Sequence, residues 1–153
     1  MGDNLVQQQF KELVSRIHKE VLKPLGFRKD GNNFRLCHPD GLCKIINFQR
    51  SAFNPWFECR FTINMGIYYE PGEELENAKF KEYHCWIRNR AAKISPQYGW
   101  DYWWIISELE KTDMELLYEE LKTLLKENVM TWFGQFTSKK ETEQKYGYMH
   151  RHI

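Results

Sequence analysis

The chain has 153 residues, a length typical of a single domain, and 42% of them are hydrophobic, which provides enough apolar surface for one buried core. The sequence contains 22 Lys and Arg residues and 21 Asp and Glu residues, so the formal net charge is only +1. This balance disfavours bulk attraction to nucleic acid or to an anionic membrane, because both depend on a large excess of positive charge.

The sequence contains no targeting or membrane-spanning pattern. Its first residues lack the basic and apolar regions of a secretory signal peptide, and it has no run of about 18 apolar residues that could cross a bilayer. We therefore expect a cytoplasmic protein that does not insert into membranes.

An amphipathic helix is predicted at residues 4–23. Asp3 or Asn4 can cap its first turn, and Pro24 and Gly26 end it. Its apolar stripe, expected to pack on the core, consists of Val6, Phe10, Leu13, Val14, Ile17 and Val21.

A β-hairpin is predicted at residues 34–46, with its turn at Pro-Asp-Gly. Pro favours the first position of such a turn and Gly the left-handed position, as in a three-residue loop with a bulge. This turn places Phe34 opposite Ile46 and Cys37 opposite Cys43.

Two strands are predicted at residues 42–51 and 57–69, where apolar and polar side chains alternate. If they pair, an even position on the first must face an odd position on the second, because a slip of one residue would exchange the two faces. Ile46 and Phe48 should then be buried with Phe61 and Ile63. The opposite face should carry Asn47, Gln49, Arg60, Thr62 and Asn64.

Two further strands are predicted at residues 83–90 and 102–107, after an exposed charged loop at residues 70–82. In the first of them, period two directs Cys85 and Ile87 inward. It directs outward the side chains of His84, Trp86, Arg88 and Arg90.

A second helix is predicted at residues 112–130, where Thr112 and Glu115 have the spacing of a capping box. The sequence after residue 136 is polar, so residues 137–153 are expected to form a flexible tail. The apolar face of the helix consists of Met114, Leu117, Leu121, Leu124 and Leu125.

These elements together predict an α+β fold of one domain, residues 1–136. The expected architecture is a two-layer sandwich, in which an antiparallel sheet of four to five strands carries the N-terminal and C-terminal helices on one face. We find no internal repeat and no linker that would divide the chain.

Several phrases, in this order along the chain, resemble a known family: LKPLGFRKDGNNF at 22–34, INFQRS at 46–51, FTINMGIYY at 61–69, CWIRNR at 85–90, and the pair Trp103 and Trp104. They are similar to the largely bacterial proteins grouped as domain of unknown function, family 4304. The resemblance covers roughly residues 9–130. It implies no activity and no catalytic residues, since none is established for that family.

The polar face of the sheet is the first candidate site. Arg and Trp are favoured where a surface binds a partner, and guanidinium groups beside amides suit an anionic or peptide-like ligand. The alternative is an ordinary solvated face with cross-strand polar pairs. The candidate ligand-binding residues are Asn47, Gln49, Arg60, Thr62, Asn64, Trp86, Arg88 and Arg90.

The cysteines and neighbouring histidines are the second candidate. The opposed Cys37 and Cys43 are close enough to share a metal or to form a disulfide. The chain has no Cys-x-x-Cys pair, however, and embedded strand residues are not the usual zinc ligands. We therefore expect Cys37, Cys43, Cys59 and Cys85 to be free thiols, with no metal and no cofactor.

Two other classes of function remain open. No nucleophile elbow, phosphate-binding Gly loop or His-Glu-x-x-His motif is present, although His84 near Glu58 or Asp101 could act as an acid and base pair. Trp86 between Arg60 and Arg88 could stack on single-stranded nucleic acid, but the charge balance disfavours this.

Our preferred hypothesis is a noncatalytic binding or interaction module with an unidentified ligand or protein partner. An enzyme acting on a small anionic substrate is the second hypothesis. A binder of RNA or single-stranded DNA is the third.

Overall fold

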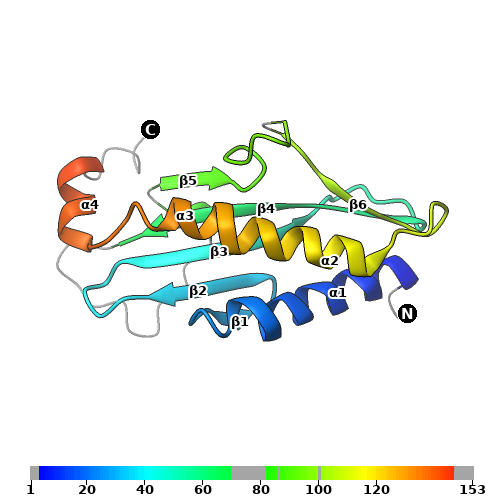
Figure 1. Cartoon of the computed structure of the whole chain (residues 1–153), viewed down its shortest axis with the longest axis horizontal. Helices are drawn as coiled ribbons and strands as arrows, with labels where there is room; N and C mark the ends of the chain where they lie inside the picture. The colour runs from blue at the N-terminus through cyan, green and yellow to red at the C-terminus, as the bar shows by residue number, and fades with distance from the viewer. Residues whose placement is uncertain (1–3, 70–81, 86, 100, 147–153) are drawn as a thin grey trace.

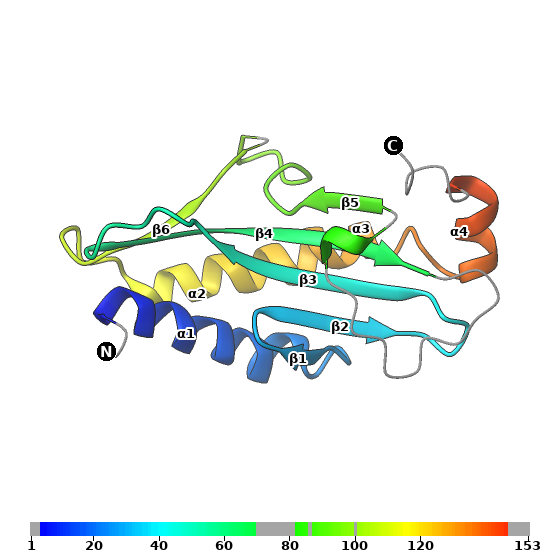
Figure 2. The same cartoon turned by 180° about the vertical axis from the view of Figure 1, so that it is seen from behind.

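The computed structural model describes residues 4–69, 82–85, 87–99 and 101–146. In these residues one antiparallel sheet carries helices on one face (Figure 1), and Figure 2 shows the opposite face. The elements are α1 (Leu5–Ile17), η1 (His18–Leu22), β1 (Arg28–Asp30), β2 (Asn33–Cys37), β3 (Cys43–Arg50), β4 (Glu58–Tyr68), η2 (Glu82–His84), β5 (Ile87–Arg90), β6 (Trp104–Ser107), α2 (Met114–Thr123), η3 (Leu124–Val129), α3 (Met130–Phe133) and α4 (Lys139–Tyr146).

The predicted α+β architecture is confirmed. The described sheet has six strands, in the order β1-β2-β3-β4-β5, and β6 also pairs with β4. The strand that the sequence did not predict is β1. Its three residues are all charged and exposed, so its sequence shows no alternation of apolar and polar residues. Because β5 pairs with residues 64–67 of β4 and β6 with residues 58–61, residues 91–103 connect two strands that lie along the same edge of β4.

The register between β3 and β4 is the one predicted. Ile46 pairs with Met65 and Phe48 with Ile63, so even positions on β3 face odd positions on β4. In β2, Phe34 pairs with Ile46 and Cys37 with Cys43, as the hairpin turn requires. Gly41 occupies the left-handed position of that turn, with a φ of 96°.

A row of aromatic rings crosses the helix-covered face of the sheet. Phe34, Phe48, Phe61 and Trp104 come from β2, β3, β4 and β6, and neighbouring ring centroids lie 5.8, 6.2 and 5.9 Å apart. Phe10 of α1 packs on this row, 5.1 Å from Phe61. The predicted apolar stripe of the N-terminal helix lies on α1 and η1 and is buried throughout, so the amphipathic pattern places this helix correctly on the core.

The helix caps differ in part from the sequence prediction. Asn4 caps α1 by accepting a hydrogen bond from the N–H of Gln7. The cap of α2 is Asp113, which accepts from the N–H of Leu116, and not Thr112. Thr112 Oγ1 instead accepts from the N–H of Ser107 at the end of β6, because the chain turns back on that strand before the helix begins.

The segment before β5 corrects one predicted orientation. Residues 82–84 form a 3₁₀ turn, and the strand begins only at Ile87. The period of two therefore does not extend back to Cys85, which lies over Gly66 on the face opposite the helices. Ile87 packs against the helix-covered core as predicted. Trp86 and residues 70–81 lie outside the described residues.

The chain ends, within the described residues, in a helix that the polar sequence did not predict. Lys139–Tyr146 form α4, which lies at one end of the sheet beside the β2–β3 turn (Figure 1). Among the described residues, no helix combines the length and apolar character needed to cross a bilayer.

Candidate functional site

A groove of about 360 Å³ lies on the sheet face that the helices do not cover. It is open to solvent and runs from β3 across β4 to β5 and the connection that follows β5. Three basic and two acidic side chains line it together with three amides. The lining residues are Gln49, Asn64, Glu82, Arg88, Asn89, Arg90, Lys93 and Asp101.

The structure brings four of the predicted ligand-binding residues together in this groove: Gln49, Asn64, Arg88 and Arg90. They meet because Asn64 pairs with Arg90 across β4 and β5, and because Gln49 lies one strand away on the same face. Arg88 points the same way as Arg90, as the period of a strand requires.

The other predicted residues do not line the groove. Asn47 is one hydrogen bond away from it through Asn64. Thr62 is fully buried, and its hydroxyl donates to the carbonyl oxygen of Tyr102 at 3.0 Å. The segment just before β6 therefore covers the sheet at this position. Arg60 is exposed and pairs with Glu58 at 2.9 Å, outside the groove. Trp86 is not among the described residues.

A chain of amides forms the floor of this face. Asn47 Nδ2 donates to Asn33 Oδ1 at 3.0 Å, and Asn64 Nδ2 donates to Asn47 Oδ1 at 3.1 Å and to Gln49 Oε1 at 2.8 Å. These hydrogen-bonded amides extend across β2, β3 and β4. Residues that are poor strand formers therefore satisfy one another's hydrogen-bonding groups. Asn64 is only 6% exposed and fixes the position of Gln49 at the groove.

Arg88 is anchored by a buried carboxylate. Its Nε donates to Glu82 Oε2 at 2.7 Å and its Nη2 donates to Glu82 Oε1 at 3.1 Å, which is a bidentate pair. Glu82 is 5% exposed, whereas half of the Arg88 side chain is exposed. The hydrogen bonds to Glu82 raise the pKa of Arg88 above its usual value. The pair therefore holds a permanently charged guanidinium at one side of the groove.

Arg90 is held more loosely at the other side of the groove. Its Nη1 donates to Asp101 Oδ1 at 2.6 Å, and its guanidinium lies 5.6 Å from the ring centroid of Trp103. Trp103 Nε1 also donates to Asp101 Oδ1, at 3.3 Å. Lys93 is exposed and forms no ion pair within the described part of the chain. A guanidinium has more N–H groups than one carboxylate accepts, so both arginines keep donors for a ligand.

The remaining lining residues were not predicted as ligand-binding residues, and Asp101 was considered only as a possible catalytic acid or base. These residues are Glu82, Asn89, Lys93 and Asp101. Glu82 lies in a predicted loop, and Asn89 lies in β5 between Arg88 and Arg90, where the period of two predicts the other face. Lys93 and Asp101 lie on the connection after β5, whose path over the sheet has no periodic pattern. The charges of Glu82, Lys93 and Asp101 are visible in the sequence, but the convergence of these residues depends on tertiary structure.

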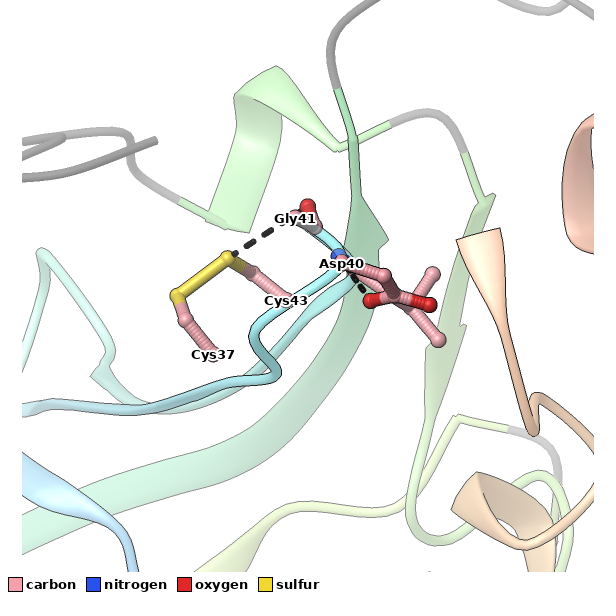
Figure 3. The surroundings of a disulfide bond; sticks show 5 residues. Cys37, Asp40, Gly41 and Cys43 are labelled. Atoms are coloured by element: carbon pink, nitrogen blue, oxygen red, sulfur yellow. Dashed lines mark hydrogen bonds between the residues drawn. A yellow bond between two sulfur atoms is a disulfide. The ribbon is translucent and has the colours of Figure 1, made fainter. Parts of the chain in front are cut away.

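The expectation of four free thiols is wrong for one pair. Cys37 and Cys43 form a disulfide across β2 and β3, with Cα atoms 4.0 Å apart (Figure 3). Their direct pairing in the register brings the two side chains together. Cys59 and Cys85 do not take part in this disulfide, and both are buried. Burial raises the pKa of the Cys59 thiol to about 11, and burial also raises the pKa of Cys85.

No metal-binding cluster is formed by the residues that the structure describes, since no three His, Cys, Asp or Glu side chains are placed to hold an ion. The groove itself presents hydrogen-bonding amides and charged side chains. Its three cations and its amides complement a small anion or a carboxylate-bearing peptide.

The family model described as domain of unknown function (DUF4304) matches residues 18–135 of the chain. The match spans more than half of the sequence, and the chain belongs to this family. The matched segment contains every residue that lines the groove and excludes α4. No curated protein and no solved structure matches the chain.

Proposed function

We propose that this domain is a noncatalytic binding module whose groove holds a small anionic ligand or the carboxylate of a peptide-like partner. The observation that carries the proposal is the convergence of Arg88, Arg90 and Lys93 with the amides of Gln49 and Asn64 in one open groove. Electrostatic attraction brings an anion to the cations, and the amides give the directional hydrogen bonds that select its shape.

The pairing of Glu82 supports binding over catalysis. Both oxygens of Glu82 accept from Arg88, so this carboxylate positions a guanidinium group. A general base needs an oxygen available to take a proton from a substrate. Asp101 uses Oδ1 to accept from Arg90 and Trp103, and so it also positions a guanidinium group, although its second oxygen takes no part in these two bonds.

The proposal is tested by titrating inorganic phosphate, citrate and an N-acetylated dipeptide into ¹⁵N-labelled protein and following the Nε–H signals of the arginines. At least one of these anions is expected to shift the Arg90 and Arg88 signals in a saturable manner. The Arg90→Ala/Lys93→Ala variant should lose this response, because it removes the two cations that are not paired with a buried carboxylate.

The matched control is Arg60→Ala, which removes an exposed arginine from the same sheet face but outside the groove. It should bind as the wild type does. Equal loss in both variants would show a nonspecific charge effect and would contradict the proposal. Saturable binding of a short single-stranded oligonucleotide that weakens steeply with salt, with no response to the three anions, would favour the nucleic-acid hypothesis.

A further inference from the structure

The Cys37–Cys43 disulfide closes the turn between β2 and β3, and its two halves lie in different environments. Cys43 is completely buried, whereas Cys37 is exposed at the edge of the turn. Thiol–disulfide exchange requires an attacking thiolate to reach one of the two sulfur atoms, and access decides which one. An external thiolate therefore reaches the bond from the Cys37 side.

The buried half has a place to remain after the bond is broken. Cys43 Sγ lies 3.8 Å from the carbonyl oxygen of Gly41 (Figure 3). A sulfur in a disulfide has no proton to donate, but a Cys43 thiol could donate to this oxygen. Cys43 also packs with Ile45 and Cys85 in a small apolar cluster. Cleavage thus leaves Cys43 in place and frees Cys37.

The loop that the disulfide closes also holds the C-terminal helix. Asp40 Oδ1 accepts from the N–H of Leu42 at 3.0 Å, and Asp40 Oδ2 accepts from the N–H of Lys139 at 2.8 Å. Lys139 is the first residue of α4, whose first-turn N–H groups have no partner within the helix. One carboxylate therefore links the turn at residues 38–42 to the start of α4.

We propose that the Cys37–Cys43 disulfide is an exchange site for a dithiol reductant, and that its cleavage loosens the attachment of α4 to the sheet. The thiolate of the reductant attacks Cys37 Sγ, forms a mixed disulfide and displaces Cys43 as a thiolate. The second thiol of the reductant then displaces Cys37. The reductant is oxidised to its disulfide, and its two electrons and two protons reduce the cysteine pair to two thiols.

The coupling to α4 follows from the restraint that the disulfide places on the loop. With the bond intact, the turn is closed covalently at Cys37 and Cys43, and Asp40 is held within reach of Lys139. With the bond broken, no covalent link restrains the loop. It is then closed by hydrogen bonds alone, from the His38 N–H to the Leu42 carbonyl at 2.8 Å and from the Gly41 N–H to the His38 carbonyl at 3.0 Å. Asp40 then occupies its position beside Lys139 for a smaller fraction of the time.

The first test is native alkylation of the full chain with iodoacetamide, before and after treatment with dithiothreitol. The oxidised protein should take up no label until it is denatured, because Cys59 and Cys85 are buried. After native reduction, mass spectrometry should find Cys37 labelled first. A bond that resists dithiothreitol until the chain is denatured would overturn the proposal, and so would exchange that yields a Cys43–Cys85 bond.

The second test is amide hydrogen exchange by NMR in both redox states. Exchange of the Lys139 N–H should accelerate roughly fivefold on reduction. This factor is the increase in the population of the exchange-competent open state that is expected when one hydrogen bond is weakened. The Cys37→Ser/Cys43→Ser variant should match the reduced wild type. Asp40→Ala should exchange rapidly at Lys139 whether oxidised or reduced, because it removes the acceptor itself.

Protection of the α1 amides serves as the internal control, since α1 lies on the helix-covered face. It should be the same in both redox states. Loss of protection in α1 together with α4 would indicate general unfolding and would overturn the proposed coupling, as would a Lys139 exchange rate that does not depend on the disulfide.

Discussion

The two faces of β3 and β4 are built from alternating residues of the same strands, yet they are held together by different interactions. On the helix-covered face, rings such as Phe48 and Phe61 pack without polar partners. On the opposite face, Asn47, Asn64 and Gln49 are joined by directional hydrogen bonds. Apolar packing tolerates many substitutions of similar volume, whereas each buried polar group requires its own partner.

This difference identifies where function can reside. The packed face buries its aromatic rings under the helices, whereas the polar face ends in a groove where arginines keep N–H groups beyond those their carboxylates accept. The same face is structural at its floor and chemically available at its rim. Substitutions on the packed face should therefore lower stability, whereas substitutions at the rim of the groove should weaken binding with little effect on stability.

The largest effect is expected on the packed face. Phe61→Ala should lower the free energy of unfolding by about 3–5 kcal/mol, because it opens a cavity among Phe10, Phe48 and Trp104. Chemical denaturation measures this change. Arg60→Ala, at the next position on the opposite face, should change the free energy by no more than about 0.5 kcal/mol. Similar losses in the two variants would contradict the assignment of the faces.

The next effect is expected at the anchored side of the groove. Arg88→Ala should cost about 2 kcal/mol of stability, because it leaves the buried Glu82 carboxylate without its partner. The Glu82→Gln/Arg88→Ala variant should recover part of the loss, since it removes the buried charge. Denaturation curves of both variants decide the matter. If the denaturation midpoint of Arg88→Ala equals that of the wild type, the Glu82 carboxylate does not need the Arg88 guanidinium to remain buried.

Much of this fold could be predicted from the sequence, because period two and period 3.6 determine which side chains share a face. Parity alone predicted that Asn47 and Asn64 lie on the face opposite Phe61. It also placed Arg88 and Arg90 together. Patterns of this kind describe one element at a time, and they carry no information about where an irregular segment returns to the sheet.

The features that could not be predicted arise from such segments. Asp101 reaches the groove on the connection from β5 to β6, and Cys85 reaches Gly66 because a 3₁₀ turn replaces the expected start of the strand. The helix α4 has a polar sequence with little apolar face, and part of its attachment comes from Asp40, far away along the chain. The disulfide was foreseen as a geometric possibility, but compartment arguments favoured free thiols.

A smaller effect is expected in the amide chain. Asn64→Ala should cost about 1 kcal/mol, because it removes the donor for both Asn47 Oδ1 and Gln49 Oε1. Gln49→Ala, at the exposed end of the same chain, should be close to neutral. Thermal denaturation of the pair compares them directly. Equal losses of stability in the two variants would show that the burial of Asn64 is unimportant and that the hydrogen-bonded amides form a solvated surface network.

Of the two groove arginines, Arg90 is expected to contribute less to stability and more to binding, so Arg90→Ala should have a small effect on stability and a large effect on binding. Its partner Asp101 is half exposed, and exposed ion pairs contribute between zero and about 1 kcal/mol. The thermal midpoint should therefore move by no more than about 4 °C in a chain of this size. The contrast with Arg88 is the critical point, because both arginines line the same groove but only Arg88 has a buried carboxylate as its partner. Calorimetry gives the midpoint, and titration with the anions that shift the wild-type signals gives the affinity. A marked fall in the midpoint, with binding retained, would make Arg90 a structural residue and would assign the groove to the same supporting role as the amide chain beneath it.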